Sequence, residues 1–301
     1  MPPINTSTDK TAIRVTADLY EAAARTRSSG RHYLGMSEIG DVCDRALWYS
    51  FRGFPQVPID GRVIMLFRFG DLIESELVEW LNRAGYQVTD QQLSFESHDG
   101  LFRGHADGIV HGITDMPHIL ECKSCNKNAF DSFKRAGVAV TQPKYYCQCQ
   151  CYMGYSGLER ALVAVQCKDD SAIYLERIYF NRTDFESLQR RAYSIISANE
   201  PIKQPFDFDS KTCQWCRFRT YCWYPEETIV SEQVCGTCQY IGFFGLKKMC
   251  RHPSHVVEIQ QWGIGCPDWV ERYSKDPRNV APVSLEEMKN FEASKAGVAT
   301  A

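Results

Sequence analysis

An acid and a lysine, Glu121 and Lys123, stand two residues apart in an otherwise apolar segment. Side chains of a β-strand alternate between its faces, so these two charged groups share one face if the segment is a strand. A second acid, Asp107, begins a short apolar stretch upstream, and the residues between the two segments include the glycine and aspartate typical of a turn. Strands over 102–110 and 117–124 are therefore expected to form a hairpin that places Asp107 beside Glu121 and Lys123.

Two carboxylates and a lysine at one end of a hairpin suit a site for a hard divalent cation. Carboxylate oxygens, a backbone carbonyl and water are the ligands of Mg²⁺ or Mn²⁺. Such an ion lowers the pKa of a bound water and offsets charge on phosphoryl oxygens, while a nearby lysine positions that water. The pattern thus predicts phosphodiester hydrolysis. The alternative is an ordinary Glu/Lys pair on a half-exposed sheet, which would contribute only about 0.2–1 kcal/mol.

These residues resemble the core motif of the PD-(D/E)XK nuclease superfamily, an Asp followed by a spacer and then an acid, any residue and a lysine. Asp107, Glu121 and Lys123 match this motif, with Ala106 in place of the usual proline. The resemblance implies an α/β fold with a restriction-endonuclease-like core, a mixed central sheet flanked by helices. It also implies Mg²⁺ or Mn²⁺ bound by Asp107, Glu121 and the carbonyl of Cys122, with Lys123 activating the water.

Two predicted helices extend the resemblance. Apolar residues recur at helical spacing in 67–86, ending at a glycine, and Glu74 borders their face. The superfamily places a glutamate on such a helix to assist the metal site. Gln148 and Tyr152 stand four apart in 142–155 and share a helix face. They match the Gln-x-x-x-Tyr motif of the RecB-like branch, where the pair supports the active site and DNA placement. A solvated Glu74 and an ordinary amphipathic helix are the alternatives.

The chain has fourteen cysteines, and the clustered ones are expected to bind metal rather than to form disulfide bonds. No apolar signal segment opens the chain, so a reducing, cytoplasmic location is predicted. Cys213, Cys216 and Cys222 follow a C-x2-C-x5-C spacing, with Cys43 far upstream. This set resembles the [4Fe–4S] staple of RecB-like nucleases, which include the CRISPR-adaptation nucleases and AddAB-type nuclease domains. Zinc bound by the same thiolates is the alternative, because spacing does not separate the two.

A second cysteine set lies beyond the resemblance. Two residues separate Cys235 from Cys238, and Cys250 and Cys266 follow, a spacing typical of a structural zinc module. His252 is the alternative to one of these ligands. Few apolar residues surround the set, so a metal would supply the folding energy of this module. The remaining cysteines are expected to be small buried hydrophobes: Cys122, Cys125, Cys147, Cys149, Cys151 and Cys167.

Composition and layout bound the other expectations. Hydrophobic residues make up 44% of the 301 residues, enough for a sizeable core, and no apolar run has the length of a membrane span. The net charge of −3 argues against a chain coated with basic residues, so any nucleic-acid affinity is expected to be local. Four regions are predicted: an N-terminal extension (1–30), a nuclease domain with the cluster (31–228), a Cys-rich module (229–272) and a C-terminal tail (273–301).

The residues and the resemblance together predict a metal-dependent DNA nuclease, an exonuclease that acts on DNA ends or single strands. Partner proteins of recombination, replication or CRISPR adaptation, and an oligomer, are compatible with this chemistry. Arg217 lies among aromatic residues that include Trp215, a mixture able to meet phosphates and stack on unpaired bases, or else to shield the cluster. The rival interpretation is a non-catalytic DNA-binding or complex-assembly protein with the same fold, which uses the Cys-rich module for docking.

Overall fold

The computed structural model describes residues 10–26, 31, 33–54, 59–225, 233–253, 255–260, 265–272, 282–284 and 286–290. Its named helices are α1 (Lys10–Arg25), α2 (Asp44–Arg52), α3 (Gly61–Arg83), α4 (Lys127–Thr141), α5 (Pro143–Ser156), α6 (Arg182–Ser197), α7 (Lys211–Gln214) and α8 (Arg219–Trp223). Its strands are β1 (Leu34–Gly35), β2 (Gln87–Thr89), β3 (Leu93–Ser97), β4 (Phe102–Ala106), β5 (Gly108–His111), β6 (His118–Cys125), β7 (Arg160–Cys167), β8 (Ile173–Tyr179), β9 (Ile241–Phe244), β10 (Lys247–His252) and β11 (His255–Glu258).

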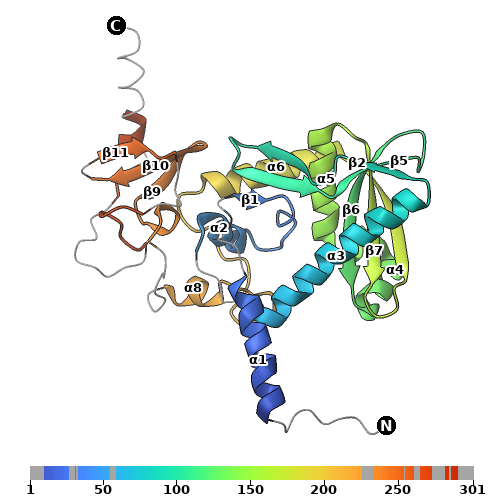
Figure 1. Ribbon diagram of the computed structural model, residues 1–301. Helices are drawn as coiled ribbons and strands as arrows, with labels where there is room; N and C mark the ends of the chain where they lie inside the picture. The colour runs from blue at the N-terminus through green and yellow to red at the C-terminus, as the bar shows by residue number, and fades with distance from the viewer. Residues whose placement is uncertain are drawn as a thin grey trace.

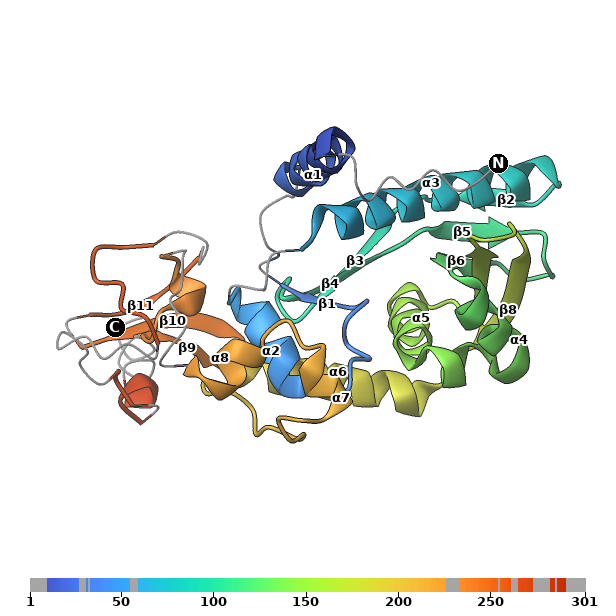
Figure 2. The ribbon, with the colours of Figure 1, turned by 90° about the horizontal axis from the view of Figure 1, so that it is seen from below.

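A five-stranded mixed sheet in the order β2-β5-β6-β7-β8 is the centre of the fold. The predicted hairpin is confirmed, since β5 and β6 pair antiparallel, while β6 and β7 run parallel. Helix α3 covers one face, and α4 and α5 cover the other (Figure 2). Ile119 accordingly packs in the large core on the α4/α5 side, and Leu120 and Cys122 pack in a smaller core with α3. The mixed α/β class with helices on both faces of the sheet is therefore as predicted.

The alternative interpretation of Glu121 and Lys123, an ordinary pair on a half-exposed sheet, is wrong for Glu121. Glu121 has 0% exposure, because α5 lies over the face that carries it. Strand alternation shows which side chains share a face, but it does not show what later segments place over that face. Helix α4 was not among the predicted elements. It is interrupted at Gly137, whose φ of 75° breaks the helical period on which such a prediction depends.

Two stretches of the chain are divided between different sheets. Residues 87–97 form β2 and β3, separated by a turn in which Asp90 and Gln92 have positive φ values of 48° and 56°. The predicted strand 102–110 is divided at Asp107. Its first half, β4, belongs to a three-stranded sheet in the order β1-β4-β3, and its second half, β5, belongs to the central sheet. Asp107 thus lies at the point where the chain passes from one sheet to the other.

Helix α3 extends well beyond the face that it buries. Its N-terminus is capped by Asp60, whose side chain accepts from the backbone N–H of Arg62, and the glycine at 85, with φ of 93°, follows its end as predicted. Leu77 is buried, but Trp80, one of the apolar residues that recur at helical spacing in 67–86, is 54% exposed, so not all of them belong to the buried face. Helix α1 packs against the start of α3 and projects from the body (Figure 1). No helix in the described part of the chain has the length and apolar character needed to cross a membrane.

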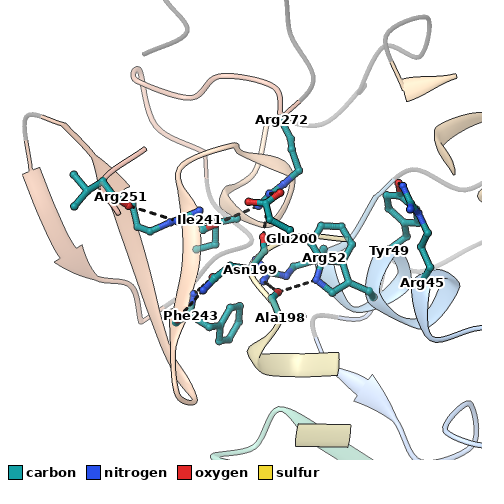
Figure 3. A network of polar contacts seen from close by, with 12 residues as sticks. Arg45, Tyr49, Arg52, Ala198, Asn199, Glu200, Ile241, Phe243, Arg251 and Arg272 are labelled. Atoms are coloured by element: carbon teal, nitrogen blue, oxygen red, sulfur yellow. Dashed lines mark hydrogen bonds and ion pairs between the residues drawn. The ribbon is translucent and has the colours of Figure 1, made fainter. Parts of the chain in front are cut away.

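Arginines join the sheet β9-β10-β11 to the main body (Figure 3). The side chain of Arg52, at the end of α2, donates to the carbonyl of Ala198 at 2.6 Å, and its guanidinium lies 4.5 Å from the Phe243 ring centre on β9. Arg272 donates to the carbonyls of Asn199 (3.1 Å) and Ile241 (3.2 Å). Burial lowers the pKa of Arg52, and the positive charge of Arg272 adds to this effect. This junction is therefore held by carbonyl and ring contacts to buried cations.

The predicted regions are only partly covered by the described residues. The predicted boundary between residues 228 and 229 lies outside them, as do residues 1–9 and 291–301 at the two ends. The four-region division therefore stays a prediction.

Candidate active site

The structure brings the predicted acids and lysine together beside β6. Asp107, between β4 and β5, accepts a hydrogen bond from the backbone N–H of Cys122 at 2.6 Å. On the neighbouring residues of β6, the Lys123 ammonium donates to a carboxylate oxygen of Glu121. Glu74, on α3, belongs to the same group, because burial and then the charge of Asp107 raise its pKa while Lys123 lowers it. Three separate elements thus converge on one set of charges.

Burial controls the protonation of this group. The Glu121 side chain is 1% exposed, and burial raises the pKa of Glu121 to about 8, although the charge of Lys123 opposes this rise. Burial also raises the pKa of Asp107, again against Lys123. Burial disfavours the ammonium of Lys123, but the charges of Glu121 and Asp107 outweigh it and raise the lysine pKa. Lys123 therefore stays protonated at neutral pH and acts as a donor and a charge.

One carboxylate oxygen in the group lacks a protein partner. Oε2 of Glu121 is buried without a hydrogen bond. A buried polar atom of this kind is costly unless another group satisfies it, and a carboxylate oxygen is the preferred ligand of Mg²⁺ or Mn²⁺. Among the described residues, no three His, Cys, Asp or Glu side chains are grouped closely enough to hold a metal ion by themselves. The donors fit an ion held by Asp107 and Glu121 and completed by the Cys122 carbonyl and water, since Mg²⁺ keeps much of its water shell.

Gln148 and Tyr152 support the site from the core side. The amide of Gln148 donates to the Tyr152 hydroxyl at 3.0 Å, and the two residues are 5% and 1% exposed. Burial raises the pKa of Tyr152, and Glu121 is the next cause, so the ring lies close to the acid group. The Tyr152 ring also stacks on Phe95, with ring centres 5.3 Å apart. These side chains therefore set the position of β6 and its neighbours, and as placed they do not reach solvent.

Two residues near the acids were missed from the sequence. The Tyr145 ring, in the first turn of α5, has its centre 5.1 Å from Nζ of Lys123. Gln92, in the turn between β2 and β3, donates its amide to Glu74 at 2.6 Å. Tyr145 stands three residues before Gln148 and so shares its helix face, a signal that could have identified it. Nothing local marks Gln92, because only the fold brings its turn to α3.

The four cysteines of the first set line one small cavity. Cys43 precedes α2, and Cys213, Cys216 and Cys222 come from α7, α8 and the turn between them; the cavity that they share has a volume of about 20 Å³. Burial raises the pKa of Cys222 to about 11, and charge on Cys43 and Cys216 adds to the rise. Thiols that line one cavity from both ends of the domain match the donor type of a [4Fe–4S] cluster, which takes one thiolate per iron, and also that of zinc. As placed in the described part of the chain, they are not grouped closely enough to hold a metal ion.

The second set lines another cavity of about 20 Å³, in the sheet that contains β9 and β10. Cys235, Cys238, Cys250 and Cys266 all contribute to its wall, and so does His252. The core beside this cavity is small, with Cys238, Tyr240 and Val270 as its buried members. The donor type again matches zinc, and His252 stays the alternative ligand. As with the first set, these described side chains are not grouped closely enough to hold an ion as placed.

The other cysteines behave as small apolar side chains. Cys149, Cys151 and Cys167 are fully buried and Cys122 is 7% exposed, while Cys125 and Cys147 are half-buried against the core. None of the fourteen cysteines, all of which lie among the described residues, forms a disulfide bond.

Comparisons with known proteins give distant likenesses only. No family model and no curated protein matches the chain. Among solved structures, SSO0001 is 15% identical with a TM-score of 0.44, over 69% of this chain and 96% of the other. An alkaline exonuclease (LHK-Exo) from Laribacter hongkongensis is 17% identical with a TM-score of 0.42, over 58% and 90%. Its complex with dAMP is 14% identical with a TM-score of 0.40, over 59% and 89%. All three scores lie below 0.5, so the function proposed below rests on the residues of this chain.

Proposed function

We propose that this chain is a metal-dependent DNA nuclease, an exonuclease that hydrolyses phosphodiester bonds at DNA ends or in single strands. The observation that carries the proposal is the convergence of Asp107, Glu121 and Lys123 around a buried carboxylate oxygen that lacks a protein partner. A Mg²⁺ or Mn²⁺ ion bound there would activate a water and offset phosphoryl charge. The same residues on a purely structural strand would leave this oxygen unsatisfied.

The side chains divide the work by their charge. Asp107 and Glu121 supply the anionic oxygens, and their raised pKa values show the cost of ionising them in the free protein. Lys123 is 22% exposed and protonated, so it can donate to a water or to a phosphate oxygen. A lysine with a raised pKa is a poor base, so its role is electrostatic and orienting. Glu74 is held by Gln92, and it would assist through the metal or through a water.

The test removes the ammonium and keeps the lysine stem. Lys123→Met should abolish cleavage of labelled single- and double-stranded DNA in Mg²⁺ or Mn²⁺, because the charge that faces the phosphate is lost. Lys127→Met is the matched control, since Lys127 is exposed at the start of α4 and pairs with Asp131. Circular dichroism would check that both variants fold. Wild-type cleavage by the Lys123 variant would contradict the proposal, and DNA binding without cleavage by the wild type would favour the non-catalytic rival.

We infer that the first cysteine set binds a [4Fe–4S] cluster, with zinc as the alternative. A cluster bound by Cys43 and by the three later cysteines would tie α2 to α7 and α8. Closing a loop of this length constrains the unfolded chain by about 4–5 kcal/mol on the polymer model. Iron, sulfide and zinc analysis of protein purified without oxygen distinguishes the two. A cluster predicts iron and sulfide in equal amounts, whereas zinc without iron would assign the site to zinc.

We also propose that Cys235, Cys238, Cys250 and Cys266 bind one structural Zn²⁺, with His252 as the alternative to one of them. Support comes from the cavity that they share and from the small core beside it. A core of this size supplies little stability without a metal. A cytoplasmic location, an oligomer and partner proteins of recombination, replication or CRISPR adaptation stay predictions.

A further inference from the structure

Trp215 is exposed where its aromatic neighbours are buried. Its side chain is 87% exposed, whereas Phe218 and Tyr221 are each 3% exposed. Phe218 lines the cavity of the first cysteine set and stacks on Tyr49, with ring centres 5.7 Å apart. Phe218 and Tyr221 therefore pack in the core, whereas Trp215 is open to solvent. An exposed indole is a flat apolar surface on which a planar ligand can stack.

Trp215 lines a second, larger cavity, the Trp215 cavity, with a volume of about 150 Å³. It adjoins the cavity of the first cysteine set, because Cys43 and Cys216 line both. The polar and aromatic residues of its wall include Glu38, Asp41, Ser50, Lys144, Trp215 and Arg217. This volume admits on the order of ten water-sized spheres, compared with one or two in each cysteine cavity. Figure 2 shows α7, which ends beside Trp215, next to α2, with α5 on the side toward the central sheet.

The first turn of α5 connects the Trp215 cavity to the candidate active site. Lys144 forms part of its wall, and the next residue, Tyr145, has its ring centre 5.1 Å from Nζ of Lys123. Both residues are in the first turn of α5. Their Cα atoms are only about 3.8 Å apart. The first turn of α5 therefore contacts Lys123 through Tyr145 and lines the Trp215 cavity through Lys144. A single strand with a phosphate at Lys123 would reach Trp215 by following this turn of α5.

The charges of the cavity suit a nucleobase more than a free anion. Lys144 pairs with Asp41 at 3.1 Å, and Arg217 approaches Glu38 at 3.8 Å, so the two cations are balanced by two acids. A neutral cavity does not concentrate anions. Its carboxylates can accept from exocyclic amines, and the Ser50 hydroxyl can donate or accept. Half-exposed ion pairs are weak. Lys144 and Arg217 can therefore each leave the carboxylate partner and pair with a phosphate at small cost.

We infer that the Trp215 cavity is a subsite for one unpaired nucleotide, whose base stacks on Trp215 while Lys144 and Arg217 face the flanking phosphates. Base stacking on an aromatic side chain is tolerant of sequence and needs a base with a free face. A duplex keeps its bases stacked on each other, so it cannot occupy the subsite. The link to cleavage rests on the nuclease function proposed above, and this subsite would direct that activity to single strands or to frayed ends.

Binding of DNA by the full-length protein tests the inference without catalysis. In buffer without added Mg²⁺ or Mn²⁺, Trp215→Ala should weaken binding of a short labelled single strand of mixed sequence about tenfold or more. Binding of a blunt duplex should not change, and Trp215→Phe should restore most of the affinity for the single strand. The matched control is Trp80→Ala, which removes a different exposed tryptophan, on α3. Wild-type affinity of the Trp215→Ala variant, or no binding of single strands by the wild type, would overturn the inference.

Kinetics separate this inference from the proposed function. If the protein cleaves DNA, Trp215→Ala should raise KM for single strands about tenfold and leave kcat within about twofold, because the ring binds the substrate away from the reacting phosphate. Cleavage with an unchanged KM would overturn the subsite and leave the nuclease intact. Single-strand binding that depends on Trp215, with no cleavage in Mg²⁺ or Mn²⁺, would overturn the nuclease and leave the subsite intact. The mutation removes no core volume, so thermal unfolding should match the wild type.

Discussion

Replacing Glu121 with glutamine should remove a pH-dependent loss of stability from the metal-free protein. Burial raises the pKa of Glu121 from 4.5 to about 8. Between these values the unfolded carboxyl is ionised while the folded one keeps its proton, so the folded state binds more protons. The stability of the wild type therefore falls as the pH rises from 4.5 toward 8. Glutamine has the same shape and does not titrate.

The magnitude follows from the window between the two pKa values. Each pH unit within it is worth about 1.4 kcal/mol, so the step from about pH 5.5 to about pH 7.5 should cost the wild type up to about 2–3 kcal/mol relative to Glu121→Gln. The side chain is 1% exposed, so solvent screening reduces this difference little. Other groups that titrate in the window contribute equally to both proteins, and their effect cancels in the comparison.

Urea unfolding without added Mg²⁺ or Mn²⁺ at the two pH values measures this difference. Glu79→Gln is the control, because Glu79 is half-exposed and pairs with Arg83 on the surface of α3. Added Mg²⁺ should stabilise the wild type at the higher pH and leave Glu121→Gln unchanged, because the ion binds the ionised carboxylate. The reasoning is refuted if Glu121→Gln shows the same fall in stability as the wild type. Mg²⁺ that stabilises both proteins equally would show that the ion binds elsewhere.

Three further substitutions test other parts of the fold. Cys213→Ala should remove visible absorbance and lower the melting temperature of the whole domain, and unchanged absorbance would assign any chromophore to other residues. Gly104→Ala should destabilise the protein by about 1–3 kcal/mol and slow cleavage, because the new Cβ would lie 2.6 Å from the Tyr152 ring and 2.8 Å from Cβ of Met36. Wild-type stability would show that both neighbours move aside without cost. Cys250→Ser should reduce bound zinc by one ion per chain, while Cys125→Ser should not; equal zinc in both variants and the wild type would exclude Cys250 as a ligand.

Local backbone geometry explains the elements that could be predicted. Strand alternation was enough to place Ile119 on one face of β6 and Leu120 on the other, and helical spacing was enough to identify α3 and α5. Turn residues marked the hairpin between β5 and β6. By contrast, the division of one predicted strand at Asp107 depends on which sheet each half joins. No pattern within 102–110 contains that information, because hydrogen-bond partners of a strand lie elsewhere in the chain.

Spacing alone determined which residues could act together: Glu121 with Lys123, Gln148 with Tyr152, and the two sets of cysteines. Only the tertiary structure decided their surroundings. Helix α5 covers the charged face of β6 and raises the pKa of Glu121, and packing buries Phe218 but leaves Trp215 open beside a cavity. The physical reason is that periodicity records the geometry of a few neighbouring residues, whereas burial and electrostatics depend on segments that are distant in sequence and meet only when the chain folds.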